Sequence, residues 1–392
     1  MSTVPNDTRL PDGTLSVLEI GMGWFPEQPG GLNRVYHDLV RNLPSAHVAC
    51  TGIITGSDLA SRETDGKIRA VVATAAPIRE RWRKIKNAVA DALASRTIDV
   101  VAAHFAIYAW PALSVIRKPL VFHFHGPWAL EGAREGAGPI TTRIKTLLER
   151  RVYRRATRLI VLSEAFKKVL CDTYGVDPDR VSVVPGGVDC NRYDIAATRH
   201  RTREQLGWPT DRPIVLAVRR LVHRMGLEDL IAATAALVAK HPKLLVYIAG
   251  KGPLSGALAK MIADKGLTDH VKLLGYVSDD DLPLAYRAAD LSVVPTVALE
   301  GFGLIAIESL AAGTPVIVTP VGGLPEVVAG LSADLICESA GADALQKALD
   351  NALDHPESLP SEEVCKSYAR KNFDTSVMAA RTRAVYQQAM KR

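Results

Sequence analysis

The chain has 392 residues, of which 47% are hydrophobic and 23% charged, and its formal net charge is +6. This composition is typical of a folded soluble protein with room for two domains, and the modest excess of cations fits anionic substrates or an anionic membrane surface. Five widely separated cysteines form no Cys-x-x-Cys pair, which supports neither a zinc site nor a disulfide framework and favours a reducing cytoplasm. Residues 1–13 lack the apolar core of a signal peptide, and no apolar run is long enough to cross a bilayer.

Short apolar runs alternate with segments of helical spacing, which indicates parallel sheets covered by helices on both faces. One series of strands is predicted at 15–21, 48–55, 98–104, 119–125, 158–162 and 181–185, and a second at 213–218, 244–249, 271–274, 291–294, 315–318 and 334–337. We therefore expect two doubly wound, Rossmann-like domains at 1–195 and 196–372. The polar stretch 190–212 reads as a linker, and an amphipathic helix at about 373–392 is expected to pack back on the first domain. Ligands of such sheets bind beyond the carboxyl ends of the strands, so the cleft between the domains is the expected site.

Two candidate ligand contacts lie in the first domain. Gly30-Gly31 precedes a helix that begins near Leu32, and the free N–H groups of that helix could cradle a phosphate. The glycine spacing does not match the dinucleotide fingerprint, so no nicotinamide cofactor is expected. His123 and His125 end a predicted strand, and His125 could hydrogen-bond a sugar hydroxyl. The other readings are a buried and an exposed β residue, or a metal site, which no nearby carboxylate or cysteine run supports.

Two basic clusters also fall in the first domain, at Arg79–Lys86, which includes Trp82, and at 143–158. They could dock to anionic lipid headgroups, with Trp82 inserting at the interface, or they could be solvated helix faces. Both readings stay open for the first cluster, and the solvated face is preferred for the second. Nucleic-acid binding is not expected, because no aromatic platform accompanies the charge. The glycine-containing stretch 126–139 reads as a mobile acceptor loop or a long surface loop.

In the second domain, Arg219, Arg220 and Arg224 follow the strand predicted at 213–218. At a strand's carboxyl end their guanidinium groups could bind a diphosphate, although a solvated basic loop would look the same. Gly250 and Gly252 form a turn after the next strand, where the backbone could approach a base or a ribose, but such turns also close many αβ units.

The most informative stretch runs from Glu300 to Glu308. Gly301 and Gly303 let the backbone come close to a ligand, and the free N–H groups of the following helix start favour a phosphate. Carboxylates accept hydrogen bonds only, so Glu308 suits the paired hydroxyls of a ribose and Glu300 those of a sugar. The segment therefore predicts a nucleotide-sugar site.

Together with Ala312–Ile317 and Gly322–Glu326, this stretch resembles the retaining glycosyltransferases of family GT4, which have the two-domain GT-B fold. Pro185–Asp189 resembles the Pro-Asn-Gly-Val-Asp motif of that family, with glycine in place of asparagine. The resemblance implies an acceptor-binding first domain and a donor-binding second domain. It implies active-site roles for Glu300, Arg220 and His125, and donor-binding roles for the following residues: Glu308, Arg224, Gly31, Gly301, Phe302, Gly303, Leu304, Gly250 and Gly252. The family's phosphate-binding lysine is Met225 here, and a thioether carries no charge, so Arg224 is expected to replace it.

The implied activity is transfer of a hexose from a nucleoside-diphosphate sugar to an acceptor hydroxyl with retention, without a metal or other cofactor. The expected setting is bacterial envelope polysaccharide, lipopolysaccharide or glycolipid synthesis, with a glycan or lipid-linked acceptor and peripheral membrane contact through Arg79–Lys86. A nucleotide-sugar epimerase of the same architecture and a non-catalytic nucleotide-sugar-binding subunit are the alternatives.

Overall fold

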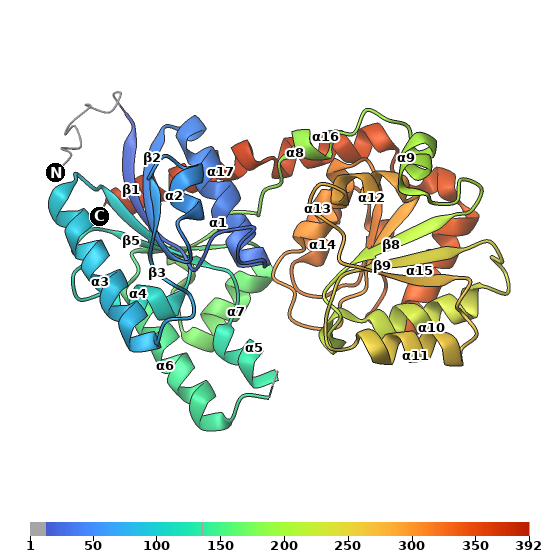
Figure 1. Ribbon diagram of the computed structural model, residues 1–392, viewed down its shortest axis with the longest axis horizontal. Helices are drawn as coiled ribbons and strands as arrows, with labels where there is room; N and C mark the ends of the chain where they lie inside the picture. Colours follow the sequence, from blue (N-terminus) through green and yellow to red (C-terminus); the bar gives the residue numbers. More distant parts are fainter. Residues whose placement is uncertain (1–12, 135, 392) are drawn as a thin grey trace. The chain divides into compact units, whose positions relative to one another are not determined.

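The computed structural model describes residues 13–134 and 136–391, which form two compact units (Figure 1). Unit 1 comprises the described residues up to Val161, then Lys167–Val184 and those from Met378 onward, while unit 2 comprises Leu162–Phe166 and Pro185–Val377. The chain thus changes unit at Val184, whereas the sequence analysis places the domain boundary after residue 195. Residues 1–12 lie outside the residues that the structure describes. They make up most of the segment 1–13, which the sequence analysis expects not to be a signal peptide. Among the described helices, none has both the length and the apolar character that a membrane span requires.

Unit 1 is built on a sheet of seven parallel strands in the order β3-β2-β1-β4-β5-β6-β7. The strands are β1 (Leu15–Ile20), β2 (Val48–Thr55), β3 (Ile68–Val72), β4 (Val100–Ala103), β5 (Leu120–Phe124), β6 (Arg158–Val161) and β7 (Val181–Val183). All residues of β4 and β5 are buried, as expected for strands with helices on both faces. The strand order reverses between β1 and β4, so the carboxyl ends of these strands mark the switch point where ligands bind in doubly wound folds.

Six of these seven strands lie within two residues of their predicted positions. The sequence analysis missed β3, which is short, lies at the edge of the sheet and carries an exposed Arg69. An edge strand needs no continuous apolar run, because only part of its surface is covered.

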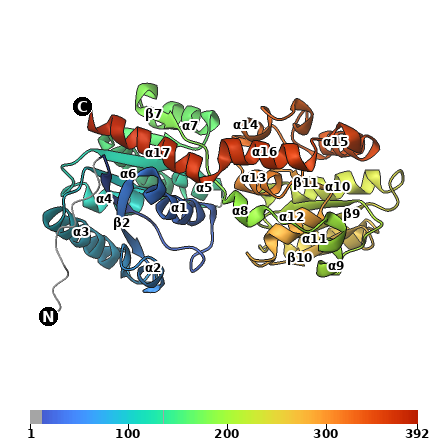
Figure 2. The ribbon, with the colours of Figure 1, turned by 90° about the horizontal axis from the view of Figure 1, so that it is seen from above.

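Helices cover the sheet of unit 1. They are α1 (Gly31–Asn42), α2 (Leu59–Glu63), α3 (Ile78–Ser95), α4 (Ala106–Ala112), α5 (Trp128–Arg134), α6 (Pro139–Arg155), α7 (Glu164–Tyr174) and α17 (Thr375–Met390). Helix α4 packs against both α3 and α6, and the three follow one another along unit 1 (Figure 1). Helix α17 runs past the strands of unit 1 (Figure 2), and the hydroxyl of Tyr386 reaches side chains of β1 and β5. The prediction of a loop over 126–139 is wrong, because α5 occupies half of it.

Unit 2 contains a second parallel sheet with the strand order β10-β9-β8-β11-β12. Its strands are β8 (Ile214–Val218), β9 (Leu245–Ala249), β10 (Val271–Gly275), β11 (Leu291–Val294) and β12 (Val316–Val318). Its helices are α8 (Cys190–Tyr193), α9 (Arg199–Leu206), α10 (Leu227–Leu237), α11 (Ser255–Asp264), α12 (Leu282–Ala288), α13 (Leu304–Ala311), α14 (Leu324–Val328), α15 (Ala342–Asp354) and α16 (Glu362–Phe373). The switch point of this sheet lies between β8 and β11. The strand predicted at 334–337 is wrong: a 3₁₀ turn, Ala333–Leu335, stands there with a single bridge from Ile336 to Val318.

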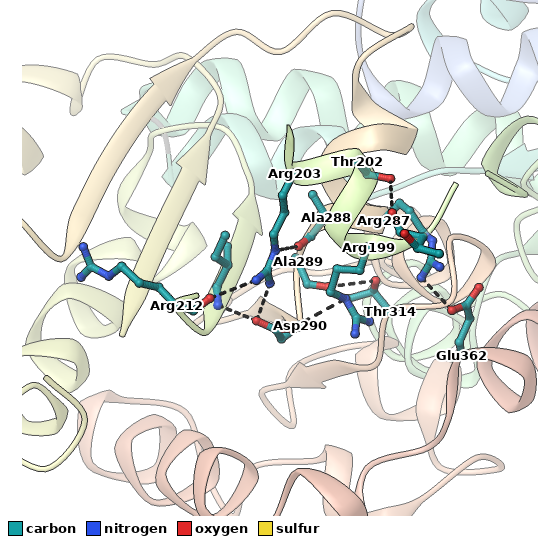
Figure 3. A network of polar contacts seen from close by, with 12 residues as sticks. Arg199, Thr202, Arg203, Arg212, Arg287, Ala288, Ala289, Asp290, Thr314 and Glu362 are labelled. Atoms are coloured by element: carbon teal, nitrogen blue, oxygen red, sulfur yellow. Dashed lines mark hydrogen bonds and ion pairs between the residues drawn. The ribbon is translucent and has the colours of Figure 1, made fainter. Parts of the chain in front are cut away.

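The prediction that 190–212 is a linker is also wrong, because this stretch belongs to unit 2 and is held there by contacts of its arginines, of which Arg203 is buried (Figure 3). Arg203 donates to the carbonyl oxygens of Ala288 and Arg212 at 2.8 and 3.1 Å, and it lies 2.6 Å from the carboxylate of Asp290. The same carboxylate accepts the backbone N–H of Ile214, the first residue of β8, at 2.8 Å. Asp290 directly precedes β11, so the cluster lies at the amino ends of the strands. These arginines therefore lie at the end of the sheet opposite to the carboxyl ends of the strands, where ligands bind.

Candidate functional site

The switch point of unit 2 holds a buried ion pair. Arg219 directly follows β8, and its guanidinium lies 2.5 Å from the carboxylate of Glu300, in the loop after β11. The side chains of Arg219 and Glu300 are 7% and 15% exposed. Arg219 also donates to the hydroxyl of Thr296, which lies 3.5 Å from the same carboxylate oxygen. The ion pair thus joins the two loops that leave the switch point.

The loop that carries Glu300 has a constrained backbone. Leu299 adopts a positive φ of 53°, and the carbonyl of Gly301 accepts a hydrogen bond from Ser163 at 2.6 Å. A Cβ atom at Gly322, where φ is +58°, would lie 1.8 Å from the carbonyl oxygen of Glu300. A Cβ at Gly301 would lie 2.6 Å from the ring of Phe166. These glycines are therefore required for close packing of the loop.

Glu326 connects this region to the start of α7. Its carboxylate accepts the backbone N–H groups of Glu164 and Ala165 at 2.8 and 2.9 Å. A carboxylate at a helix start satisfies free N–H groups and interacts favourably with the helix dipole. In unit 2, Glu326 therefore holds the first turn of α7 beside the Glu300 loop.

The cations expected to face a diphosphate have different surroundings. Arg220 is exposed, and its side chain forms no hydrogen bond or ion pair with the described residues. Arg224 donates to the carbonyl oxygen of Leu299 at 2.9 Å, so it braces the Glu300 loop. Met225 is 5% exposed and packs in the core of unit 2. Diphosphate binding by Arg220 and Arg224 stays a prediction, whereas the guanidinium of Arg219, the first of the three arginines, pairs with Glu300.

Glu308 lies one turn into α13, whose first residue follows Gly303 in a left-handed conformation with φ of 97°. Glu308 is 3% exposed and accepts a hydrogen bond from the hydroxyl of Tyr286 at 3.2 Å. Contact between this carboxylate and a ribose stays a prediction.

The residues on either side of Gly303 pack inward. Phe302 is 3% exposed and contacts Phe373 edge-on, with 5.8 Å between ring centroids. A Cβ at Gly186 would lie 2.8 Å from the Leu304 side chain, so a larger residue at this position would have to displace Leu304. The backbone of Gly303 and Leu304, which opens α13, is thus held in place for the predicted phosphate contact.

The turn after β9 needs glycine for a structural reason. A Cβ at Gly250 or Gly252 would lie 1.8 or 2.4 Å from the carbonyl oxygens of Arg219 and Leu221. The backbone of Leu221 also donates to the carbonyl of Lys251 at 3.0 Å. Close backbone packing between the exits of β8 and β9 accounts for both glycines, and their contact with a donor stays a prediction.

In unit 1, His125 ends a chain of buried polar groups at the switch point. Its Nε2 lies 3.0 Å from Nδ1 of His104, which follows β4. Nε2 of His104 lies 3.0 Å from the carboxylate of Glu19 in β1. The other oxygen of Glu19 accepts the hydroxyl of Tyr386 at 2.9 Å, and this hydroxyl lies 2.9 Å from Nε2 of His123. Because Tyr386 donates to Glu19, its oxygen is free to accept from His123.

Burial controls the charge of this network. It lowers the pKa of His104 to about 3 and lowers the pKa values of His123 and His125 well below the usual range, with further lowering from the charge of His104. Burial also raises the pKa of Glu19, against the opposing effects of His123 and the Tyr386 hydrogen bond. The three imidazoles are therefore neutral at pH 7 and act as hydrogen-bonding groups.

No carboxylate lies near His123 in the sequence, but the fold brings Glu19 close to it. Ligand atoms of Glu19, His104 and His123 lie within 4.8 Å of one another, a spacing that could accommodate a metal ion. Each of these atoms already has a hydrogen-bonding partner at 2.9 to 3.0 Å. The arrangement thus satisfies its buried polar groups internally.

Gly31 is the first residue of α1 and is exposed, and apart from its chain neighbours no atom of the described residues lies within 4 Å of a Cβ placed there. The loop before it is braced by Asn33, which accepts the backbone N–H of Gly23 at 3.2 Å and donates to the carbonyl of Gln28 at 3.0 Å. The helix therefore begins where predicted, and a phosphate contact at Gly31 stays a prediction.

Comparison with known proteins identifies the chain. The family model described as Glycosyltransferase Family 4 matches residues 29–192, and that described as Glycosyl transferases group 1 matches residues 198–372. D-inositol 3-phosphate glycosyltransferase 2 of Catenulispora acidiphila is 33% identical over 309 residues, which cover 74% of this chain and 71% of that protein. The chain belongs to glycosyltransferase family 4.

Solved glycosyltransferase structures share the fold of this family 4 chain. Sucrose-phosphate synthase from Thermosynechococcus elongatus superposes with a TM-score of 0.78 at 22% identity, covering 95% of this chain and 98% of that one. Anabaena Alr3699/HepE in complex with UDP gives a TM-score of 0.77 at 19% identity, covering 95% and 100%. The two parallel sheets are thus those of the GT-B fold, as predicted.

Sequence reasoning on this glycosyltransferase missed three features of the two switch points. It chose Arg220 and did not single out Arg219, although both follow the same strand. It also missed the role of Ser163, which bonds to the Glu300 loop. The third missed feature is the network of polar groups around Glu19. The sequence did contain a signal for it, because a carboxylate within a buried apolar strand requires partners from elsewhere in the fold.

Proposed function

We propose that this glycosyltransferase transfers a hexose from a nucleoside-diphosphate sugar to an acceptor hydroxyl with retention at the anomeric carbon. The observation that carries the proposal is the Arg219–Glu300 pair at the switch point of unit 2, beside the glycine turn that opens α13. This arrangement offers a carboxylate for sugar hydroxyls and free N–H groups for phosphate oxygens. The neighbour Alr3699/HepE has been solved with UDP and with UDP-glucose, so UDP-glucose is the first donor to test.

The proposed chemistry needs stabilisation of the departing diphosphate. The bond from the anomeric carbon to the phosphate oxygen breaks, and the acceptor oxygen forms its bond on the same face of the sugar. The leaving phosphate oxygen takes the acceptor proton, so no side chain is assigned as a general base. Arg220, which is exposed, and the start of α13 would stabilise the negative charge, and we propose that neither a metal nor another cofactor takes part.

Glu300 and His125 would hold the sugar in this scheme. The ion pair with Arg219 orients the Glu300 carboxylate, whose oxygens accept hydrogen bonds from hydroxyls. His125 is held by His104 and stays neutral, which suits hydrogen bonding to a hydroxyl. Glu308 would bind the ribose. By analogy with the family, the acceptor would be a glycan or a lipid-linked glycan of the bacterial envelope.

The first experiment is a thermal-shift screen of the full chain against nucleoside diphosphates and their sugars, because a ligand that binds only the folded state raises its stability. The donor that gives the largest shift is then used with a panel of glycan and lipid-linked acceptors, and the product's anomeric configuration is determined by NMR. Formation of an α-linked product from an α-linked donor supports the proposal. Epimerisation of the donor without an acceptor would identify an epimerase. Binding with neither transfer nor slow hydrolysis would identify a non-catalytic subunit.

Two variants test the residues of the site. Glu308→Ala and Arg220→Ala should each lower kcat/KM for the donor by about ten- to a hundredfold, the effect of losing a hydrogen bond to a charged group. Arg201→Ala is the matched control, because Arg201 is an exposed arginine on α9, near the amino ends of the strands. Undiminished transfer at limiting donor in both site variants would refute the assignment of these residues.

A further inference from the structure

Helix α6 exposes an apolar stripe. Ile140, Ile144 and Leu147 are 75%, 61% and 59% exposed. Their spacing of four and then three residues places them on one face of the helix. Large apolar side chains are normally exposed singly, so a contiguous row marks a surface that is covered by something else.

The same stripe becomes basic toward the end of α6. Arg151 and Arg154 continue the spacing from Leu147 and are exposed, and Arg143 is exposed beside Ile144. None of these three arginines forms an ion pair with a described residue. The acidic residue of the helix, Glu149, is fully buried. The outward charge of α6 is therefore wholly cationic and uncompensated.

Helix α3, which the sequence analysis proposed for membrane contact, lacks such a stripe. Its basic residues Arg79 and Arg83 are exposed, but Trp82 is half-buried and packs against Trp110 with 4.9 Å between ring centroids. Among the described residues of α3, no large apolar side chain is exposed. The solvated-face reading therefore fits α3, and the combination of apolar and basic groups occurs on α6 instead.

We propose that α6 docks this protein to a bilayer containing anionic phospholipids. An interfacial helix of this kind places its apolar side chains at the boundary of headgroups and acyl chains while its arginines contact the lipid phosphates. Ile140, Ile144 and Leu147 would enter that boundary, and Arg143, Arg151 and Arg154 would bind the headgroups. The proposal concerns unit 1 alone and does not depend on the donor or on the reaction.

Charge and shape favour a membrane over other partners. A second copy of the chain docking through the same face would bring two sets of unpaired arginines together, which is unfavourable. A nucleic acid would use the arginines but would gain nothing from the isoleucines and leucine. The side chains stand out from the helix, as their high exposure shows, so they suit a deformable lipid surface.

The experiment is flotation of the full chain with vesicles of 70% phosphatidylcholine and 30% phosphatidylglycerol, and with vesicles of phosphatidylcholine alone, at several salt concentrations. We expect binding to the anionic vesicles only and a decrease as salt rises, since screening weakens charge attraction. Ile144→Glu with Leu147→Glu should lower the partition coefficient at least about tenfold. Arg151→Glu with Arg154→Glu should also lower the partition coefficient at least about tenfold. Each basic residue near an anionic surface raises this coefficient about fivefold.

The matched control is Arg79→Glu with Arg83→Glu, which makes the same charge change at two exposed arginines one helical turn apart on α3. It should keep the partition coefficient within about threefold of that of the unmodified chain. Cooperative thermal unfolding and unchanged far-UV circular dichroism of all variants show that each has folded. Absence of binding to anionic vesicles, unchanged binding by both α6 variants, or loss confined to the α3 variant would overturn the proposal. A dimer in sedimentation velocity that Ile144→Glu with Leu147→Glu dissociates would overturn it too, because α6 would then be covered by a second copy.

Discussion

The guanidinium of Arg219 lies 2.5 Å from the carboxylate of Glu300, and both side chains are largely buried at the switch point of unit 2. Arg219 is the first residue after β8, and Glu300 lies in the loop that follows β11. The pair therefore joins the two loops that diverge from the switch point. Because Thr296 accepts from the same guanidinium, the carboxylate is held in one orientation. A sugar that binds to Glu300 would therefore meet a group already fixed in place, with little reorganisation on binding.

Breaking this pair should be costly for stability. Arg219→Met leaves the Glu300 carboxylate buried without its cation, and Glu300→Gln leaves the guanidinium buried without its anion. Each variant should lower the free energy of unfolding by about 3 kcal/mol, measured by urea denaturation. The double variant should be less destabilised than the sum of the two, with a coupling free energy of about 1 to 3 kcal/mol.

Arg220→Met is the matched control for that cycle, because Arg220 is the next residue and its side chain is exposed. Its free energy of unfolding should stay within about 0.5 kcal/mol of the original value. Additive effects of the two single variants would show that the ion pair contributes nothing.

A methyl group at Gly322 should displace the Glu300 loop. The new Cβ would lie 1.8 Å from the carbonyl oxygen of Glu300, so the loop must move in Gly322→Ala. Gly207→Ala is the control, because its φ of +66° is similar and, within the described part of the chain, no atom beyond its neighbours lies within 4 Å of the new Cβ. The control should lose only the roughly 1 kcal/mol of left-handed backbone strain and keep its activity. Gly322→Ala should lose more stability than the control and about a hundredfold in transfer rate, the effect of a misplaced reacting group. Equal losses of stability and of transfer rate in the two variants would show that close packing at Gly322 does not position the Glu300 loop.

The positions of the strands could be predicted because most of them are continuous apolar runs in a sheet buried on both faces. The errors fall where this signal is incomplete. Strand β3 lies at an edge and includes an exposed Arg69. Residues 334–337 have the apolar character of a strand but form only one bridge, because strand formation depends on a partner that the local sequence does not specify. The arginines at 190–212 suggested a solvated linker because their partners, such as Asp290, lie about ninety residues away.

The candidate site could be predicted in part. The glycines around Glu300 and the helix that follows indicated a ligand-binding turn, and the turn lies at the carboxyl edge of the sheet as expected. The sequence could not show which of Arg219 and Arg220 is buried. Neighbouring residues after a strand point in opposite directions, so a shift of one residue in register would exchange them. The network of Glu19 was not predictable, since its partners His104 and Tyr386 lie 85 and 367 residues away in the chain.

Removing one hydroxyl should show how much this network stabilises unit 1. In Tyr386→Phe, Glu19 loses a donor and His123 loses its acceptor, and both are buried. An unsatisfied buried polar group costs about 1 to 3 kcal/mol, so the free energy of unfolding should fall by at least about 2 kcal/mol. Tyr276→Phe makes the same chemical change at a ring that is 62% exposed, and its free energy of unfolding should change by less than about 0.5 kcal/mol. A similar small change in both variants would show that water replaces the lost hydroxyl.

Glu149 should make stability depend on pH. It is fully buried in α6, accepts hydrogen bonds from Tyr153 at 3.2 Å and Tyr174 at 2.8 Å, and burial raises its pKa from 4.5 to about 7. Between these two values the folded state holds the proton that the unfolded state has released, so the contribution of Glu149 to stability is lost as pH rises. The loss amounts to roughly 3 kcal/mol, at about 1.4 kcal/mol for each pH unit. Glu149→Gln removes the titration, so the variant should gain about that much relative to the original chain between pH 4.5 and 7.5. Urea denaturation of both proteins across this range measures the difference, and a constant difference would mean that the carboxyl titrates at the same pH in the folded and unfolded states.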